Sequence, residues 1–402
     1  MKQNKKEKGN FPNLRFKEFQ GEWEERKLGE IAVITKGVGI SKEQLSETGH
    51  LCILYGELYT KYKSEIIQKI LSHTNIDSAK LVKSKANDVI IPSSGETAID
   101  IATARCVLFS DILLGGDINI IRLKNDNGSF LSYQLNGVRK YDIAKIAQGI
   151  SVVHLYGENL KKLKITICSN EEQNKIAVFL SLIDERISTQ IKIIEKYESL
   201  IKGINNFIFE KLKTEKTIPF YQLYDKAGEG GTPDTKISDY YKNGEIPFIK
   251  IDDLKGKYLE NNQSFISETG LKNSSAWLVP ANSIIYSNGA TIGSISINKY
   301  TVATKQGILG IVLKVGISLE YMYYFMISQY FKREICKVTT QGTMKTAYLK
   351  DINKIKCFLP DYETQINVVR ILNVLSLKIE IEKQFLNNLE KQKQYLLQQM
   401  FI

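Results

Sequence analysis

The sequence predicts a mixed α+β protein in which two globular α/β domains alternate with two long helices that pair as a coiled coil. Three observations predict this fold class. Two segments carry a heptad pattern of apolar residues, an offset of 192 residues relates one segment to the other, and short β-type runs fill the chain before each segment. Together they indicate a pseudo-two-fold internal repeat, in which each half is a globular domain followed by a long helix.

The heptad positions repeat in steps of four and three residues, which keeps one seam of a helix facing a partner helix. The seam of the first segment is Ile176, Leu180, Ile183, Ile187, Gln190, Ile194, Tyr197 and Ile201, and it continues to Ile204 and Ile208. The seam of the second is Val368, Leu372, Leu375, Ile379, Glu382, Leu386, Leu389, Lys393, Leu396 and Met400. Gln190 and Glu382 are the one matched pair that is polar in both copies, and we interpret them as a register marker.

Composition and periodicity divide the chain into four parts. A first globular domain is expected over residues 1–170, a first long helix over 171–213, a second globular domain over 214–360 and a second long helix over 361–402. The first long helix would be about 60 Å long at 1.5 Å per residue. Within the domains, helices are expected over about 129–146 and 318–338, and the aromatic run 321–331 fits a helix packed on a core better than a base-stacking platform.

The repeat extends into the globular parts. The stretch 90–101 overlays 284–295 and keeps an Ile-Ile pair, a serine, a glycine and a threonine. Gln148-Gly149 overlays Gln341-Gly342 in the same way, each pair after an expected helix. These matches are sparse but collinear, so the globular halves have diverged while the helices have kept their register.

Composition excludes several classes of protein. The net charge of +11 and the pI near 9.1 favour a polyanionic partner. No apolar run reaches 18 residues, which predicts a cytoplasmic protein without a membrane span. Five well-separated cysteines and three scattered histidines indicate neither a disulfide framework nor a metal site, and no phosphate-binding Gly-rich loop ending in Gly-Lys-Ser/Thr is present. We therefore expect no catalysis by this chain alone, no cofactor and no metal.

Two polar loops recur in both halves and are candidates for reading base edges, because Asn, Glu, Gln, Ser and Thr can all hydrogen-bond to bases. Ordinary polar turns are the alternative. The first-half loop residues are Ser93, Ser94, Glu96, Thr97, Gln148, Gly149, Ser151 and His154. The second-half loop residues are Ser287, Asn288, Thr291, Gln341, Gly342, Thr343 and Lys345. Candidate phosphate contacts, or else solvated surface charges, are Lys36, Arg105, Lys250 and Lys305.

Several motifs occur in a characteristic order along the chain. They are PNLRFKEFQGEWEERKLGEI at 12–31, GTPDT at 231–235, GEIPFIKIDDL at 244–254, QGTMKTAYLKDINKIKCFLP at 341–360 and LLQQMF at 396–401. Glu171 and Gln173 at the start of the first helix are matched by Glu363 and Gln365 at the start of the second. With these motifs the whole chain resembles the specificity subunit of a type I restriction-modification system.

The resemblance implies a DNA-binding subunit without catalytic activity. It implies two target recognition domains, each reading one half of a bipartite, gapped double-stranded DNA site, and antiparallel helices that act as a spacer. It also implies partners: two methyltransferase subunits, which bind S-adenosylmethionine, and two restriction subunits, which use ATP and Mg. Two other interpretations remain open from the residues alone. One is a stand-alone regulator that homodimerises through its coiled coil, and the other is a scaffold without a nucleic-acid role.

Overall fold

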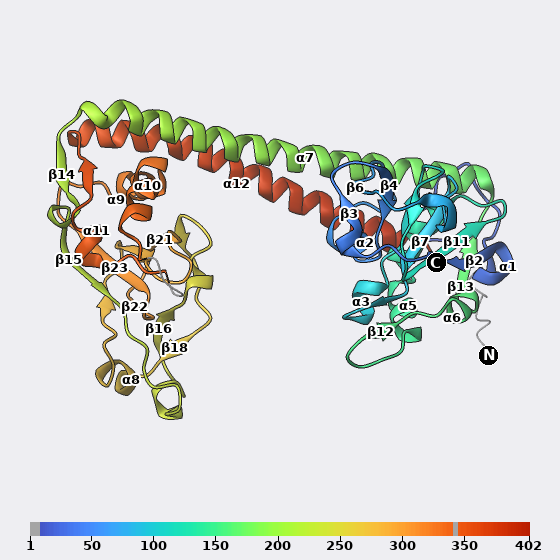
Figure 1. The fold of residues 1–402 in the computed structure, drawn as a ribbon, viewed down its shortest axis with the longest axis horizontal. Coiled ribbons are helices and arrows are strands. Elements are labelled where there is room, and N and C mark those ends of the chain that lie inside the picture. The colour runs from blue at the N-terminus through green and yellow to red at the C-terminus, as the bar shows by residue number, and fades with distance from the viewer. Residues whose placement is uncertain (1–8, 341–344) are drawn as a thin grey trace, which may run out of the picture. The chain divides into compact units, whose positions relative to one another are not determined.

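The computed structural model describes residues 9–340 and 345–402, and the chain forms two compact units. The described part of unit 1 is residues 9–192 together with 384–402, and that of unit 2 is residues 193–340 together with 345–383. Each unit therefore contains one globular domain, part of the first long helix and part of the second (Figure 1).

Unit 1 is built on two sheets. The five-stranded sheet has the order β2 (Ala32–Lys36), β11 (Ile118–Leu123), β7 (Asp88–Pro92), β9 (Arg105–Val107) and β5 (Ile66–Ile67). Its strands are antiparallel except for β5, which runs parallel to β9. The four-stranded sheet has the order β10 (Leu113–Leu114), β4 (His50–Ile53), β6 (Ser72–Thr74) and β3 (Leu45–Ser46). The central strand β7 is buried along its whole length, which the apolar run from Val89 to Pro92 predicts, and its first residue, Asp88, is paired with Arg122.

Unit 2 repeats the topology of the five-stranded sheet. Its five-stranded sheet has the order β15 (Tyr224–Glu229), β23 (Ile308–Leu313), β20 (Ile284–Ser287), β21 (Ile295–Asn298) and β17 (Tyr258–Leu259). Here too only the last pair of strands is parallel. The second sheet has the order β18 (Phe265–Ile266), β16 (Ile246–Ile249), β22 (Val302–Thr304) and β19 (Leu278–Val279). The two five-stranded sheets have the same strand order and directions, although their sequences share few residues. In the second sheets, β22–β16–β18 has the same order and directions as β10–β4–β6 in unit 1, but the fourth strand differs: β3 pairs with β6 in unit 1, and β19 pairs with β22 in unit 2.

Small antiparallel ribbons complete both units. In unit 1, β1 (Glu24–Lys27) pairs with β13 (Lys164–Ile167), and β8 (Ser94–Gly95) pairs with β12 (Val153–His154). In unit 2, β14 (Thr217–Pro219) pairs with β24 (Lys356–Phe358). Each of the ribbons β1–β13 and β14–β24 joins the start of its globular domain to the strand that leads towards a long helix.

The short helices cover the sheets. In unit 1 they are α1 (Leu28–Ile31), α2 (Glu57–Thr60), α3 (Ala98–Ile101), α4 (Gly128–Asn136), α5 (Lys140–Ile146) and α6 (Gly157–Lys161), with the 3-10 turns η1 (Lys42–Gln44) and η2 (Ser78–Lys80). In unit 2 they are α8 (Glu268–Lys272), α9 (Leu319–Ile327), α10 (Gln329–Val338) and α11 (Leu349–Ile352), with η3 (Leu212–Thr214), η4 (Phe220–Gln222), η5 (Ser238–Tyr240) and η6 (Ile251–Asp253).

Two expected helices are each divided in two, which corrects the expectation of single helices over 129–146 and 318–338. In unit 1, α4 ends at Asn136, and at the C-cap residue Gly137 the backbone leaves the helical conformation before α5 begins. In unit 2, Ser328 is extended, with φ −64° and ψ 155°, and its hydroxyl accepts a hydrogen bond from the backbone N–H of Phe331. Serine thus caps a new helix, a local preference that helical periodicity alone does not reveal.

The long helices are α7 (Asn170–Lys211) and α12 (Tyr362–Gln399). In unit 1 the start of α7 clusters with the end of α12, Leu180 with Leu396 among others. In unit 2 the end of α7 clusters with the start of α12, Phe209 with Leu372 among others. The two helices are therefore antiparallel within each unit (Figure 1). Every seam residue from Ile176 onward is buried or half-buried, and Glu382 pairs with Lys378 at 2.6 Å.

The aromatic run in 321–331 lies in the core of unit 2, as the sequence predicts. Tyr321, Tyr324, Phe325 and Phe331 are each at most 1% exposed, and they pack with Phe209 at the end of α7. Base stacking by these rings is therefore excluded. The fold class predicted from the sequence is confirmed: two α/β domains and two paired long helices form an internal repeat. In the described ranges, none of the helices is both long and apolar enough to cross a membrane.

Candidate nucleic-acid interface

The two polar loops of unit 1, which are far apart in the sequence, meet at the end of the central strand β7. β8 follows β7 after Ser93 and pairs with β12, so that Gly95 lies opposite Val153 and Ser94 opposite His154. Between Gln148 and His154 the chain makes a tight turn closed by two backbone hydrogen bonds of 2.9 and 2.7 Å. The sheet topology thus joins the loops around 93–97 and 148–154 into one surface.

Gly149 is required by the geometry of this turn. Its φ is +126°, and a Cβ atom at this position would lie 2.1 Å from the carbonyl oxygen of Val152. Only glycine adopts this conformation without strain. Ile150, the residue after Gly149 in this turn, is 99% exposed to solvent. Gly149 therefore forms the tight turn that is one of the two roles expected for it.

Unit 2 joins its two loops in the same way. Gly289 forms an isolated bridge with Thr346, and the backbone N–H of Ala347 donates to the carbonyl oxygen of Asn288 at 2.8 Å. Thr291 and Lys345 are exposed on either side of this bridge. Gln341, Gly342 and Thr343 were also predicted to belong to this loop, and they lie outside the described residues.

Lys250 and Lys305 lie side by side in unit 2. They directly follow β16 and β22, whose parallel pairing places Ile249 beside Thr304, and the backbone N–H of Lys305 donates to the carbonyl oxygen of Ile249 at 3.0 Å. Both lysines are exposed. The turn after Lys305 reaches the loop at 288–289, because the N–H groups of Asn288 and Gly289 both donate to the carbonyl oxygen of Gly307. Lys305 therefore precedes a turn that contacts the polar loop, and Lys250 lies beside Lys305.

Exposure separates the predicted contact residues into two groups. The exposed ones are Lys36, Glu96, Thr97, Gln148, Gly149, Ser151, His154, Lys250, Thr291, Lys305 and Lys345. The buried ones are Ser93, Ser94, Arg105, Ser287 and Asn288. The side chains of the second group are shielded from solvent and do not form part of the exposed surface.

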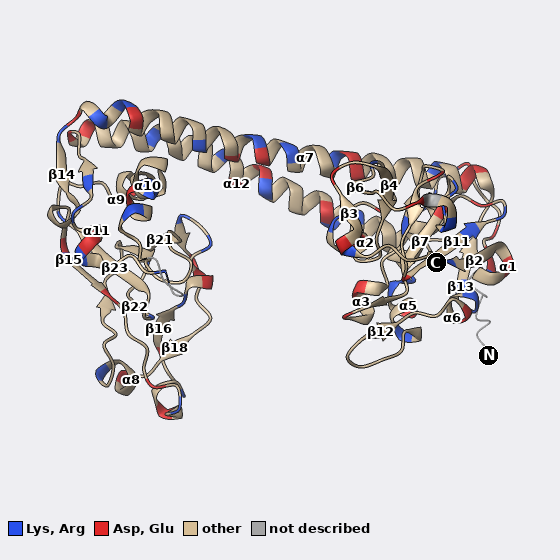
Figure 2. Ribbon diagram, in the orientation of Figure 1, with Lys and Arg blue, Asp and Glu red and all other residues tan. Residues whose placement is uncertain are grey.

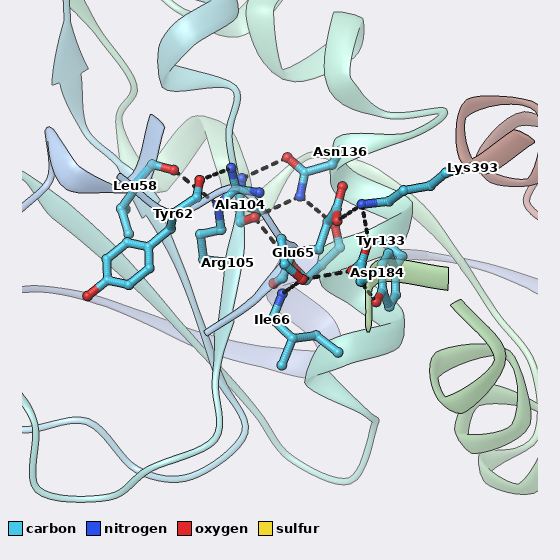
Figure 3. A network of polar contacts seen from close by, with 12 residues as sticks. Leu58, Tyr62, Glu65, Ile66, Ala104, Arg105, Tyr133, Asn136, Asp184 and Lys393 are labelled. Atoms are coloured by element: carbon cyan, nitrogen blue, oxygen red, sulfur yellow. Dashed lines mark hydrogen bonds and ion pairs between the residues drawn. The ribbon is translucent and has the colours of Figure 1, made fainter. Parts of the chain in front are cut away.

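Arg105 is the clearest case in which the structure places a predicted phosphate contact elsewhere. It is 7% exposed in β9, and its guanidinium donates to the backbone carbonyls of Leu58 at 3.0 Å and Tyr62 at 2.8 Å (Figure 3). Burial lowers its pKa, against the raising influence of Glu65 and Asp184. A charge committed to two internal carbonyls stabilises the fold of unit 1, so Arg105 is not positioned to bind a phosphate.

Asn288 has a comparable internal role in unit 2. Its side chain is fully buried, and its Nδ2 donates to the carbonyl oxygen of Ala347 at 3.2 Å. Ser287 is also fully buried and donates from its hydroxyl to the carbonyl oxygen of Gly289 at 3.0 Å. These two residues hold the loop and the returning chain segment together.

Sequence reasoning missed a pair of matched tyrosines beside these loops. Tyr156 and Tyr348 are 192 residues apart, each precedes a short helix as its N-cap residue, α6 or α11, and each is 47% exposed. The ring of His154 stacks on Tyr156 with centroids 6.1 Å apart, and Lys350 Nζ lies 5.6 Å from the Tyr348 ring centroid. The helix offset of 192, applied to the loops, is the signal that would have found them.

A second surface lies on the long helices. On α12 within unit 2, Ile371, Val374, Leu377 and Ile381 are 50–64% exposed and recur at helical spacing, so they form one apolar stripe. In unit 1, a groove of about 600 Å³ is lined by Phe179, Leu182, Ile183, Glu185, Arg186, Thr189, Gln190, Phe385 and Leu389. Elsewhere on both helices acidic and basic residues are interspersed (Figure 2). Exposed apolar stripes of this kind mark protein–protein contacts.

The described part of the chain contains no candidate metal-binding cluster. Across residues 9–340 and 345–402, no group of three or more His, Cys, Asp or Glu side chains is placed to hold a metal ion. Of the histidines, His50 and His73 lie in β4 and β6, and His154 lies in the loop surface. The cysteines are free thiols.

Comparisons with known proteins agree with this arrangement. The family model for the type I restriction modification DNA specificity domain matches the chain twice, over residues 20–196 and 220–391. The MjaVIII type I restriction enzyme specificity subunit of Methanocaldococcus jannaschii is 24% identical over 424 residues, covering 95% of this chain and 94% of that protein. The MjaIX specificity subunit of the same organism is 31% identical over 180 residues, which are 43% of this chain and 40% of that protein.

A solved structure has the same fold. The crystal structure of the type I restriction-modification system S subunit from M. genitalium superposes with a TM-score of 0.55 at 18% identity, covering 98% of this chain and 99% of that one. Specificity subunits carry no cofactor, and catalysis by the complex resides in its modification and restriction subunits. Because the family model matches both halves and most of the length, the chain belongs to the DNA specificity subunits of type I restriction-modification systems.

Proposed function

We propose that each unit reads one half of a bipartite, gapped site in double-stranded DNA. In unit 1 the reading surface is the joined loop pair with Glu96, Thr97, Gln148, Ser151 and His154 exposed. In unit 2 it is the matching loop pair with Thr291 and Lys345 exposed. The exposed Lys36, Lys250 and Lys305 supply phosphate contacts, which fix the position of each unit on the duplex without selecting a sequence.

One observation carries this proposal. The same loop pair occurs at the same end of the same five-stranded topology in both units, and the exposed residues differ between them. A shared frame with different exposed donors and acceptors is what two readers of unequal DNA sequences require, because the pattern of hydrogen-bonding groups in the major groove distinguishes the four base pairs.

We further propose that the paired helices set the spacing between the half-sites and bind two methyltransferase subunits. Two restriction subunits then bind to this assembly. The antiparallel arrangement within each unit supports this, because matched helix positions present related surfaces to two copies of one partner. The apolar stripe of Ile371, Val374, Leu377 and Ile381 in unit 2 and the groove beside Phe179 and Leu182 in unit 1 are the surfaces that we assign to these partners.

Methylation in cells tests the reading function. Co-expression of this chain with its methyltransferase partner, followed by single-molecule sequencing, should reveal new adenine methylation at one gapped motif. Exchanging residues 1–168 for those of a relative should change one half of that motif and leave the other half intact. A change in both halves, or no new methylation with an active partner, would contradict the proposal.

The spacing role has its own test. Deleting one heptad from α7 and the facing heptad from α12 should shorten the gap between the half-sites or abolish assembly with the methyltransferase, because the helical phase between two fixed readers depends on their separation. Active complexes that still methylate the wild-type motif would show that the helices do not set the gap.

A homodimeric regulator is disfavoured by the helix packing. Such a protein would pair the heptad seam with a second copy, but in each unit the seam is already buried between α7 and α12 of one chain. Gel shifts with the purified chain alone separate the two functions. The regulator would bind a palindromic operator tightly without any partner, whereas the specificity subunit should require its methyltransferase for tight binding.

A further inference from the structure

A buried charge network joins the end of α12 to the first domain. Lys393 Nζ contacts the carboxylates of Glu65 and Asp184, and the three side chains are 12%, 9% and 6% exposed (Figure 3). The Tyr133 hydroxyl donates to Asp184 at 2.8 Å, and Lys393 Nζ lies 5.8 Å from the Tyr133 ring centroid. The single cation of Lys393, at the end of α12, thus forms ion pairs with two carboxylates of unit 1.

Within residues 9–340 and 345–402, no second cation is paired with either carboxylate. Asp184 also accepts a hydrogen bond from the Ser64 hydroxyl at 2.7 Å, whereas the nearby Arg105 guanidinium donates to the backbone carbonyls of Leu58 and Tyr62. Burial lowers the pKa of Lys393, but Glu65 and Asp184 raise it, and the rise prevails. Lys393 is therefore charged in the folded protein. The docking of α12 in unit 1 places this positive charge beside Glu65 and Asp184.

The matching place in unit 2 can be identified from the backbone. The carbonyl oxygen of Glu65 accepts from Cys106 N at the edge of the five-stranded sheet, and that of Lys257 accepts from Ile297 N at the same edge of the repeated sheet. Tyr324 stands at the same place in α9 as Tyr133 in α4, counted from the N-cap residue. Glu65 and Lys257 are therefore equivalent positions that carry opposite charges.

Unit 2 supplies its own cation. Lys257 Nζ contacts Glu320 and the side chain of Asn373, and it lies 4.8 Å from the Tyr324 ring centroid. The Tyr324 hydroxyl bonds to Asn373 at 2.8 Å and to Ser376 at 3.0 Å. Both units thus place a lysine beside a matched tyrosine, but the lysine comes from α12 in unit 1 and from the globular domain in unit 2. At the α7 position that matches Lys393 stands Ile201.

We infer that this inverted charge arrangement determines which helix end docks on the first domain. The domain binds the C-terminal end of α12 from its own chain and disfavours the matching end of α7 from a second copy. We call the ion pairs of Lys393 with Glu65 and Asp184 the recognition key. An exchanged α7 would place Ile201 against Glu65 and Asp184 and leave two buried carboxylates without a cation, which is strongly unfavourable. An exchanged α12 would bring Lys393 towards Lys257, a like-charge contact. A chain with two near-duplicate docking faces needs such a device against domain swapping.

The key can be tested on the full-length chain with Lys393→Ile, the double variant Glu65→Lys with Lys393→Ile, and Lys391→Ile as an exposed control on the same helix. Hydrogen exchange reports the docking of residues 394–402, and light scattering over a range of concentrations reports the mass. Lys393→Ile should raise exchange in this segment by about tenfold or more, while the control matches wild type. Neither measurement depends on DNA binding, so a failure of the proposed function would leave this test unaffected.

The double variant moves the lysine from α12 into the globular domain, as in unit 2, and the introduced lysine can meet Asp184 of α7. It should recover the lost protection and, without the key, form exchanged dimers as the concentration rises, whereas the wild type remains monomeric. Wild-type protection in Lys393→Ile would overturn the inference. A double variant no better protected than the single one, or one that stays monomeric at every concentration, would do the same.

Discussion

Gln173 and Gln365 lie 192 residues apart in the first turns of α7 and α12, and they make the same pair of hydrogen bonds. The side-chain oxygen of Gln173 accepts from the backbone N–H of Asn127, and that of Gln365 accepts from Ser318, each at 2.9 Å. Their amide groups donate to the carbonyl oxygens of Cys168 and Pro360, again each at 2.9 Å. Asn127 and Ser318 cap α4 and α9, so each glutamine ties a long helix to a core helix.

Replacing either glutamine by leucine should destabilise one unit. Gln173→Leu leaves the N–H of Asn127 without its acceptor in unit 1, and Gln365→Leu does the same to Ser318 in unit 2. A buried donor left unsatisfied costs about 1–3 kcal/mol. Chemical denaturation measures the loss, and hydrogen exchange locates it. The exposed neighbours Glu171→Ala and Glu363→Ala are controls that should change stability by less than about 0.5 kcal/mol. Equal losses in the controls would refute a specific role for the glutamines.

Tyr156 and Tyr348 should contribute to DNA affinity through separate half-sites. Loss of a base–aromatic stack costs about 1–3 kcal/mol. Tyr156→Ala or Tyr348→Ala should therefore weaken the binding of the complex to its gapped DNA motif about tenfold. Fluorescence anisotropy with the assembled methyltransferase complex measures the affinity. Phenylalanine at either position should retain binding if the ring stacks and lose it if the hydroxyl contacts a phosphate. Tyr395→Ala, exposed on α12, is the control, and an equal effect there would contradict the assignment.

Charge placed on the apolar stripe of α12 should block assembly with the methyltransferase. Val374 and Leu377 are 64% and 57% exposed, so Val374→Glu and Leu377→Glu cost the isolated chain little but introduce a carboxylate into a dry interface. Co-elution on size exclusion measures assembly. Asn387→Glu adds the same charge to an exposed position of α12 away from the stripe, and it should assemble normally. Full assembly of both stripe variants would remove this surface from the proposed interface.

Acid should weaken unit 2 through Glu320. Burial raises the pKa of Glu320, but hydrogen bonds from Lys257, Tyr258 and Asn373 lower it, and the lowering prevails. A carboxyl whose folded pKa is depressed stabilises the fold above its unfolded pKa, and this contribution is lost as the pH falls through the folded value. Stability of unit 2 should therefore decline below about pH 4.5. Glu320→Gln should lower stability at neutral pH and flatten the acid decline; an unchanged acid profile would contradict this account.

The long helices were predictable from the sequence because their signal is local and periodic. Every heptad residue from Ile176 to Leu396 is buried or half-buried, since a 3.5-residue repeat leaves a helix one way to hide its apolar side chains. The division of the expected helices at Gly137 and Ser328 was not predictable in this way. There a cap residue overrides a helical pattern, and capping depends on backbone geometry that periodicity does not carry.

The predicted loop residues show the limit of side-chain chemistry as a guide. Thr97 and Asn288 are both polar residues after a buried strand, but Thr97 is exposed and Asn288 is fully buried. Arg105 looked like a phosphate ligand by type, and it donates instead to two internal carbonyls. Residue type indicates what a side chain can bind, and only the surrounding backbone decides whether water or protein meets it.

The repeat, the heptad seam and the family could be predicted from the sequence alone, because each of these depends on local spacing or on the order of motifs. The tertiary structure alone decided which distant residues meet. It joined the loops at 93–97 and 148–154 on one surface, and it placed Lys393 beside Glu65, which lies 328 residues earlier in the chain. The physical reason is that buried charges and paired strands gain their stability from neighbours across the fold, and sequence separation does not encode these neighbours.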